Sequence, residues 1–136
     1  MLTSRSETFA VRAAPDVVTV RQVVRSWCLS LGMGLVDLTK IVTAASEIAR
    51  NTLDYGKGGT MLLEEVRDGF RAGVRLTFED QGPGIADIER AMTDGYTSGS
   101  GMGLGLGGTK RLVDDFKLES TPGAGTRVAI VKWKSR

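Results

Sequence analysis

Apolar and polar positions along the first half of the chain predict one strand followed by two helices. Residues 7–12 alternate between polar and apolar, as a half-buried strand does. Apolar residues then recur at helical spacing over residues 16–31 and again over residues 36–54, with Asp16 and Asp37 as expected caps. Trp27 and Cys28 lie in the first of these helices, and we expect both to be packing residues. The second helix should bury a stripe made of Leu38, Ile41, Val42, Ala45, Ile48 and Ala49.

The second half of the chain predicts two strand pairs separated by helical segments. Residues 60–66 and 72–79 form the first pair, and residues 117–121 and 126–133 form the second. Between the pairs, we expect a short helix over residues 86–91 and a longer one over residues 109–116. No internal repeat or composition shift divides the chain, so residues 1–136 are expected to form one domain. This mixture of helices and mostly antiparallel strands predicts an α/β two-layer sandwich.

Composition narrows the classes of function. The net charge of +2 over 136 residues gives no basic surface for nucleic acid, and no apolar run is long enough to span a bilayer. The chain has no histidine, which excludes histidine-based catalytic triads and histidine metal ligands. Cys28 is the one cysteine, and the N-terminal residues lack the apolar core of a signal peptide. We therefore expect a cytoplasmic protein that binds neither nucleic acid nor membranes.

A glycine-rich stretch at residues 99–108 is the strongest local signal. Six of its ten residues are glycine, and it runs directly into the helix expected at residues 109–116. Backbone N–H groups exposed by such a turn at a helix start bind anions, above all phosphate. A flexible surface loop is the alternative that this stretch alone leaves open.

Two further patterns carry polar groups of possible chemical use. Glu47 and Asn51 are four residues apart on the second expected helix, so they share one face, although a plain solvated face would look the same. The run Asp80-Gln81-Gly82-Pro83-Gly84 follows a strand and predicts a sharp turn that brings backbone close to a neighbour. An ordinary turn is the simpler interpretation of that run.

Taken together and in this order, these motifs resemble those of the GHKL (Bergerat) ATP-binding superfamily. That group includes gyrase-type topoisomerases, the heat-shock chaperone, histidine kinases and MutL. Glu47 and Asn51 match its N box, and Asp80, Gly82 and Gly84 match its first glycine box. The run Gly101-Met102-Gly103-Leu104-Gly105-Leu106 matches its second, and Gly125-Thr126 its last. The resemblance implies a mixed, mostly antiparallel sheet covered on one face by helices.

The resemblance also implies roles for these residues, with ATP and Mg²⁺ as cofactors. Asn51 would supply the protein ligand to Mg²⁺, and Glu47 would act as general base toward an incoming hydroxyl. Asp80 would accept a hydrogen bond from the exocyclic amine of adenine, assisted by Thr126. The glycines at 82 and 84 would admit the base, and the second glycine box, including Met102, Leu104 and Leu106, would surround the phosphates. Residues 92–100 would form a lid over ATP.

Within the superfamily, the chain resembles the small serine kinases that act on bacterial anti-sigma regulators, of the RsbT type. The sequences at residues 46–52 and 105–112 resemble those of that subfamily. It implies phosphorylation of a serine or threonine on a STAS-domain antagonist (RsbS- or RsbR-like), followed by activation of a metal-dependent protein phosphatase (RsbU-like). Two alternatives stay open. One is an RsbW-like anti-sigma factor that sequesters a sigma subunit, and the other is a nucleotide-dependent binding module with little catalysis.

Overall fold

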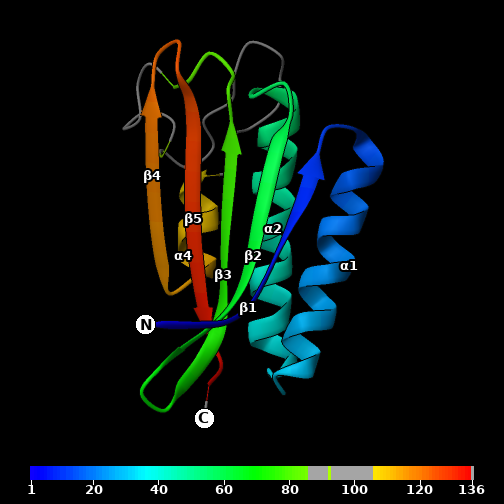
Figure 1. The fold of residues 1–136 in the computed structure, drawn as a ribbon, viewed down its shortest axis with the longest axis vertical. Helices are drawn as coiled ribbons and strands as arrows, with labels where there is room; N and C mark the ends of the chain where they lie inside the picture. The colour runs from blue at the N-terminus through cyan, green and yellow to red at the C-terminus, as the bar shows by residue number, and fades with distance from the viewer. Residues whose placement is uncertain (86–91, 93–105, 136) are drawn as a thin grey trace.

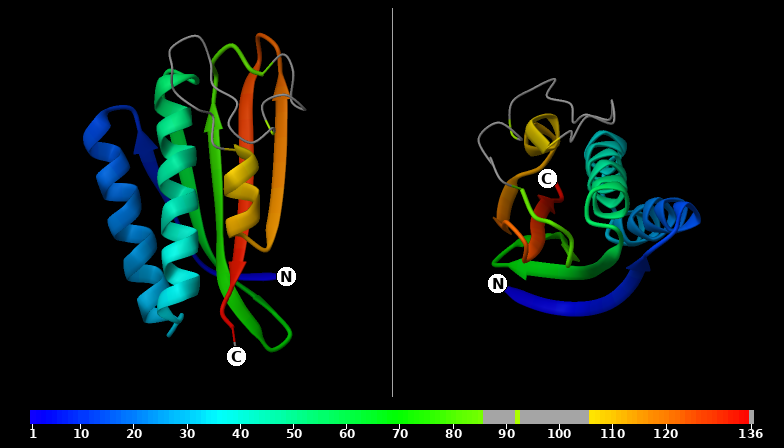
Figure 2. Two further views of the ribbon diagram at one scale, coloured as in Figure 1. Left: turned by 180° about the vertical axis from the view of Figure 1, so that it is seen from behind. Right: turned by 90° about the horizontal axis from the view of Figure 1, so that it is seen from above.

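The protein is a single antiparallel sheet with helices packed on one face. The computed structural model describes residues 1–85, 92 and 106–135. Its elements are β1 (Leu2–Val11), α1 (Ala14–Ser30), α2 (Leu35–Asp54), β2 (Gly59–Asp68), β3 (Arg71–Asp80), α4 (Leu106–Leu112), β4 (Asp115–Thr121) and β5 (Gly125–Trp133). The strands are ordered β1-β2-β3-β5-β4, and each of these neighbouring pairs is antiparallel. Within the described residues, α1, α2 and α4 lie on the same face of the sheet (Figure 1, Figure 2), which confirms the predicted two-layer sandwich.

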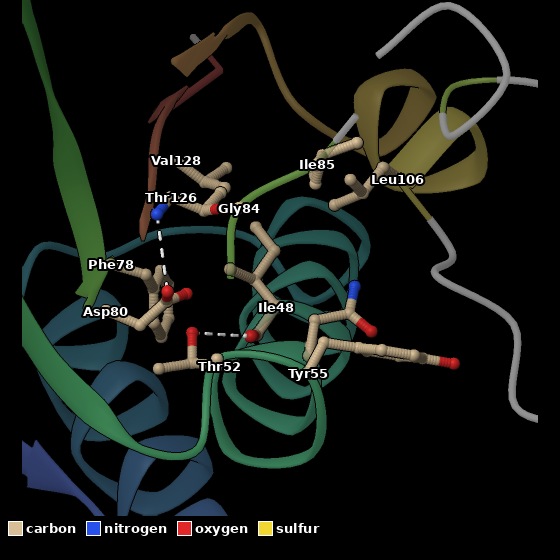
Figure 3. Close-up of a pocket in the computed structure, with 12 residues that line it drawn as sticks. Ile48, Thr52, Tyr55, Phe78, Asp80, Gly84, Ile85, Leu106, Thr126 and Val128 are labelled. Carbon is tan, nitrogen blue, oxygen red and sulfur yellow. Dashed lines mark hydrogen bonds between the residues drawn. The ribbon is translucent and has the colours of Figure 1, made fainter. Parts of the chain in front are cut away.

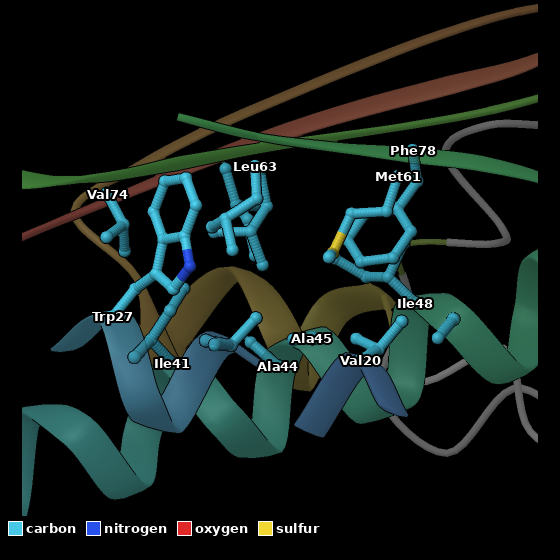
Figure 4. Close-up of a cluster of buried hydrophobic side chains, with 14 of the residues drawn as sticks. Val20, Trp27, Ile41, Ala44, Ala45, Ile48, Met61, Leu63, Val74 and Phe78 are labelled. Atoms are coloured by element: carbon cyan, nitrogen blue, oxygen red, sulfur yellow. The ribbon is translucent and has the colours of Figure 1, made fainter. Parts of the chain in front are cut away.

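The core fills the space between the sheet and the two long helices (Figure 4). Alternate residues of β2, β3 and β5 point toward α2, whose stripe is buried as predicted except at Val42, which is partly buried. Trp27 and Cys28 of α1 are buried too, and burial raises the pKa of the Cys28 thiol to about 12. The side chains that meet across this layer include Leu38, Ile41, Ala45, Ile48, Met61, Leu63, Val74, Leu76, Phe78, Val128 and Ile130.

Both aspartates expected to cap the long helices lie inside them instead. The residues at the cap positions are Ala13 and Gly34. Asp16 sits at the third helical position, from which its carboxylate accepts the Arg12 and Ala13 N–H groups at 2.8 and 3.1 Å. The carboxylate of Asp37, in the first turn of α2, bonds instead to residues that follow β5 or lie in it. It accepts hydrogen bonds from Ser135 and pairs with Lys132.

The predicted helix over residues 109–116 is displaced toward the N-terminus. It begins at Leu106 and ends at Leu112, because the chain is then held against β5. The Asp114 N–H donates to the Val131 carbonyl at 2.9 Å, and its carboxylate accepts the Trp133 N–H at 2.7 Å. The first strand also starts earlier than predicted, at Leu2. The helix expected at residues 86–91 lies outside the described residues, as does the expected lid over residues 92–100 apart from Met92.

Candidate functional site

A pocket lies where the C-terminal half of α2 meets the end of β3, the start of β5 and the start of α4 (Figure 3). Its lining includes five residues with polar side-chain atoms, Asn51, Thr52, Tyr55, Asp80 and Thr126. The rest of the lining is apolar or glycine and comes from Ile48, Gly56, Phe78, Gly84, Ile85, Leu106 and Val128. Apolar walls with a few convergent polar groups are typical of a small-molecule site.

Asp80 is the anchored acceptor of this pocket. It ends β3 opposite Thr126 of β5 and is 9% exposed. Its Oδ1 accepts the Gly82 N–H at 2.9 Å and the Thr126 N–H at 3.2 Å. Burial raises the pKa of Asp80 above its ordinary value, and the two N–H bonds partly offset that shift. The side chain is therefore fixed in place as a partly desolvated acceptor.

Glycines let the backbone close tightly around Asp80. A Cβ on Gly56 would stand 2.3 Å from the Asp80 carboxylate, and one on Gly82 would stand 2.7 Å from the Gly56 backbone. Gly84 has a φ of +76°, and a Cβ there would lie 2.3 Å from the Thr121 carbonyl oxygen. The first glycine box is thus packed between the end of α2 and the β4–β5 turn.

The N-box residues lie on α2, one turn apart, at different depths. Asn51 is partly buried and lines the pocket, whereas Glu47 is exposed and lies outside the lining. The Asn51 carbonyl accepts the N–H groups of Tyr55 and Gly56 at 2.9 and 3.2 Å, and α2 ends there. The structure therefore brings Asn51 to the same pocket as Asp80, with Glu47 one helical turn away.

Leu106 is the one residue of the second glycine box within the described part of the chain. It begins α4, is 2% exposed, and packs with Tyr55, Ile85 and Met92 at the pocket. The other predicted members of that box, Gly101, Met102, Gly103, Leu104 and Gly105, lie outside the described residues. Among the site residues predicted from the sequence, the pocket lining itself contains Asn51, Asp80, Gly84, Leu106 and Thr126.

Several lining residues were not predicted as site residues. Ile48 was predicted only as core, and Gly56 only as loop, although the glycine cluster directly after the Asn51 helix is a signal that could have marked it. Phe78 and Val128 show no sequence signal beyond their places on inward strand faces. Ser120, which lies behind the lining, was not predicted either; it hydrogen bonds Ile85, directly after the first glycine box, and Thr126.

The chemistry of the lining is of the kind that a purine nucleotide needs. The apolar side chains would suit the faces of the base, and Asp80, a buried acceptor, would suit its polar edge. The amide oxygen of Asn51 is a ligand of the type that Mg²⁺ accepts alongside phosphate oxygens and water. Within residues 1–85, 92 and 106–135, no group of three Asp, Glu, Cys or His side chains could hold a metal by itself. No helix in this part of the chain could cross a membrane.

Comparison with known proteins agrees with this geometry. Residues 36–136 match the family model of histidine kinase-, DNA gyrase B-, and HSP90-like ATPases. The chain belongs to this ATPase family. The resemblance inferred from the sequence motifs is thereby confirmed. The expected mixed, mostly antiparallel sheet covered on one face by helices agrees with the described elements, whose strand pairs are all antiparallel. Family membership implies that the chain binds ATP.

Two curated relatives show which members of the family the chain is similar to. The chain is 45% identical over 118 residues to the serine/threonine-protein kinase RsbT of Bacillus subtilis, covering 87% of this chain and 89% of the relative. It is 31% identical to an anti-sigma F factor of Thermoanaerobacter sp. (strain X514), covering 83% and 82%. The predicted enzyme class, a protein-serine/threonine kinase, agrees with the name of the first relative.

A solved structure shares the fold. The crystal structure of the RsbU and RsbW domains of Rv1364c from Mycobacterium tuberculosis superimposes with a TM-score of 0.68 at 21% identity, covering 98% of this chain and 33% of that one. At this identity, the likeness supports the fold alone.

Proposed function

We propose that this protein is an ATP- and Mg²⁺-dependent protein-serine/threonine kinase of the RsbT type. The observation that carries the proposal is the convergence of Asn51, from α2, and Asp80, from β3, on one pocket with apolar walls. An ATPase-family chain with 45% identity to a protein kinase over most of both lengths supports the reaction class.

Asp80 selects the base in this proposal. Its carboxylate, held by the Gly82 and Thr126 N–H groups, accepts a hydrogen bond from the 6-amino group of adenine. The 6-oxo group of guanine would present a lone pair to the same carboxylate and would be repelled. The side chains of Ile48, Phe78 and Val128 exclude water from the buried part of the base.

Asn51 and Glu47 act on the phosphate side. Mg²⁺, when bound, neutralises charge on the phosphates during transfer, and the Asn51 amide oxygen is its protein ligand. Glu47 takes the proton of the attacking serine or threonine hydroxyl. Its exposed position, one turn from Asn51, leaves it open to a hydroxyl carried by another protein. The residues of the second glycine box bind the phosphates through their N–H groups.

The substrate in this proposal is a STAS-domain antagonist, and the released kinase then activates a metal-dependent phosphatase. Both assignments are what the resemblance to RsbT-type kinases implies, and the exposure of Glu47 is compatible with a hydroxyl carried by another protein. The site of action in this proposal is the cytoplasm.

Phosphotransfer from γ-labelled ATP to a STAS-domain partner tests the proposal. We expect Glu47→Gln and Asn51→Ala each to lower the rate by about 100-fold or more. Glu7→Gln, which changes an exposed carboxylate on edge strand β1, should keep the wild-type rate. Transfer of label by Glu47→Gln at the wild-type rate would overturn the role of Glu47.

An anti-sigma factor is the second candidate, favoured by the 31% identity to an anti-sigma F factor. The sequence lacks an arginine in the four residues before the second glycine box, where that group usually carries one. Co-purification with a sigma factor, in preference to a STAS protein or a phosphatase, would support this candidate. ATP binding without transfer to any partner would instead support a nucleotide-dependent binding module.

A further inference from the structure

Ser120 joins three elements around the base-binding end of the pocket. It lies on β4, is partly buried, and pairs with Thr126 of β5 in the sheet register. Its Oγ accepts the Ile85 N–H at 2.7 Å, directly after the first glycine box. The same atom lies 3.1 Å from the Gly125 carbonyl oxygen and 2.9 Å from the Thr126 Oγ1.

These three contacts fix where two hydroxyl protons point. A hydroxyl has one proton to donate and two lone pairs to accept with. A carbonyl oxygen cannot donate, so the contact with Gly125 uses the Ser120 proton. The contact between the two hydroxyls must then carry the Thr126 proton toward Ser120. With the Ile85 N–H as its second donor, the Ser120 hydroxyl is fully used.

We infer that Ser120 is a specificity-determining residue, because it turns the Thr126 hydroxyl into an acceptor toward the pocket. With its proton committed to Ser120, Thr126 presents only lone pairs beside the Asp80 carboxylate. The polar edge of the pocket then consists of acceptors from two side chains. Such an edge matches the 6-amino group of adenine, or a water that donates to both, and rejects a 6-oxo purine.

Without the Ser120 hydroxyl, the Thr126 hydroxyl proton no longer has Ser120 as its hydrogen-bond acceptor. Thr126 can then rotate and donate to a 6-oxo group, so discrimination between the two kinds of purine weakens. Ser120 does not line the pocket itself and acts through Thr126, which makes it a positioning residue. This inference rests on the proposed function, because it assumes that a purine occupies the pocket.

Calorimetric titration with ADP and inosine diphosphate tests the inference. Inosine diphosphate carries a carbonyl in place of the 6-amino group, and a proton on the adjacent ring nitrogen. We expect the wild type to bind ADP more tightly, and Ser120→Ala to lower that preference by about three- to tenfold, the value of one hydrogen bond. Ser120→Thr, which keeps a hydroxyl, should restore the preference. Thr121→Ala, which removes an exposed neighbouring hydroxyl, should leave the preference unchanged.

The outcomes separate this inference from the proposed function. A wild type that binds no ADP, or that does not prefer it, overturns the proposed function and this inference with it. A wild type that prefers ADP, with a Ser120→Ala variant that keeps the same preference, overturns the role of Ser120 alone. An equal loss for both nucleotides indicates a structural role and also overturns it. If Ser120→Ala does not fold, Thr126→Val removes the same acceptor and keeps the Thr126 N–H, so its preference must fall for the inference to stand.

Discussion

Gly56 lies against the carboxylate of Asp80 so closely that a Cβ at Gly56 would stand 2.3 Å from both Cγ and Oδ2 of Asp80. Gly56 follows the helix that carries Asn51, and Asp80 ends β3. The contact therefore ties the position of the buried acceptor to the end of α2. It also explains why a residue outside the sequence motifs belongs to the site.

Gly56→Ala should displace Asp80 and weaken nucleotide binding. The backbone of Gly56 does not have a positive φ, so the effect comes from the clash and not from backbone strain. We expect the Kd for ADP to rise at least tenfold, measured by calorimetry. Gly34→Ala is the matched control, because a Cβ there meets no atom within 4 Å. An unchanged Kd in Gly56→Ala would contradict the account of this contact.

Asp80→Asn should abolish adenine recognition and stabilise the fold at neutral pH. Burial raises the pKa of Asp80, so ionisation is less favourable in the folded chain than in the unfolded one. The folded chain is therefore most stable, relative to the unfolded chain, below the ordinary carboxyl pKa, where Asp80 is neutral in both states. This stability is lost as the pH rises through the higher pKa that Asp80 has in the folded chain. The variant should therefore exceed the wild type in unfolding free energy at pH 7, with the difference vanishing in acid. Chemical denaturation at several pH values measures this, and a less stable variant at pH 7 would contradict it.

Glu64→Gln should destabilise the fold at pH 7 by about 1.5–3 kcal/mol, the usual value for hydrogen bonds to a charged group. Glu64 accepts two hydrogen bonds from Arg75, at 2.9 and 3.0 Å, and one from Thr3 at 3.1 Å. Arg75, and to a lesser extent Thr3, lower the pKa of Glu64. The contribution of ionised Glu64 to the unfolding free energy is therefore present above the ordinary carboxyl pKa. It is lost as the pH falls through the lower pKa that Glu64 has in the folded chain.

The unfolding free energy of the Glu64→Gln variant, followed from pH 7 into acid, checks this contribution. Glu119→Gln is the control, since its pair with Lys117 is exposed and should be worth less than about 1 kcal/mol. A loss in Glu64→Gln that stays constant into acid would show that charge is not its cause.

Ile41→Ala and Ile48→Ala should distinguish an effect on the stability of the core from an effect on nucleotide binding. Both side chains are at most 1% exposed, and each truncation should cost about 2–5 kcal/mol of unfolding free energy. Only Ile48 also lines the pocket. Ile48→Ala should therefore weaken ADP binding severalfold, while Ile41→Ala leaves the Kd unchanged under folding conditions. Equal effects of the two variants on Kd would argue against the mapped pocket wall.

Periodicity predicted the long elements well, because one face of each is buried. The stripe on α2 and the alternation in β2, β3 and β5 carry that information residue by residue. Helix ends were less predictable, since Asp37 is held by Ser135, 98 residues away in the sequence. The end of α4 was placed too late, at residue 116 instead of Leu112, because the alternation in β4, with Phe116 packed against the core, is hard to separate from helical spacing over so few residues.

The pocket-lining residues that the sequence predicted, among them Asn51, Asp80 and Thr126, stand in motifs with fixed spacing. Gly56 and Ser120 were not, because their importance comes from contacts between elements distant in sequence. Ser120 meets Ile85, 35 residues earlier, and nothing local to residue 120 marks that contact.

The central claim is that the base of ATP lies in the pocket between α2 and the ends of β3 and β5. A crystal structure with Mg²⁺ and a non-hydrolysable ATP analogue measures this most directly. We expect the 6-amino nitrogen of adenine about 3 Å from a carboxylate oxygen of Asp80, with Asn51 on the phosphate side. A nucleotide bound elsewhere, with Asp80 and Asn51 both out of contact with it, would contradict the account.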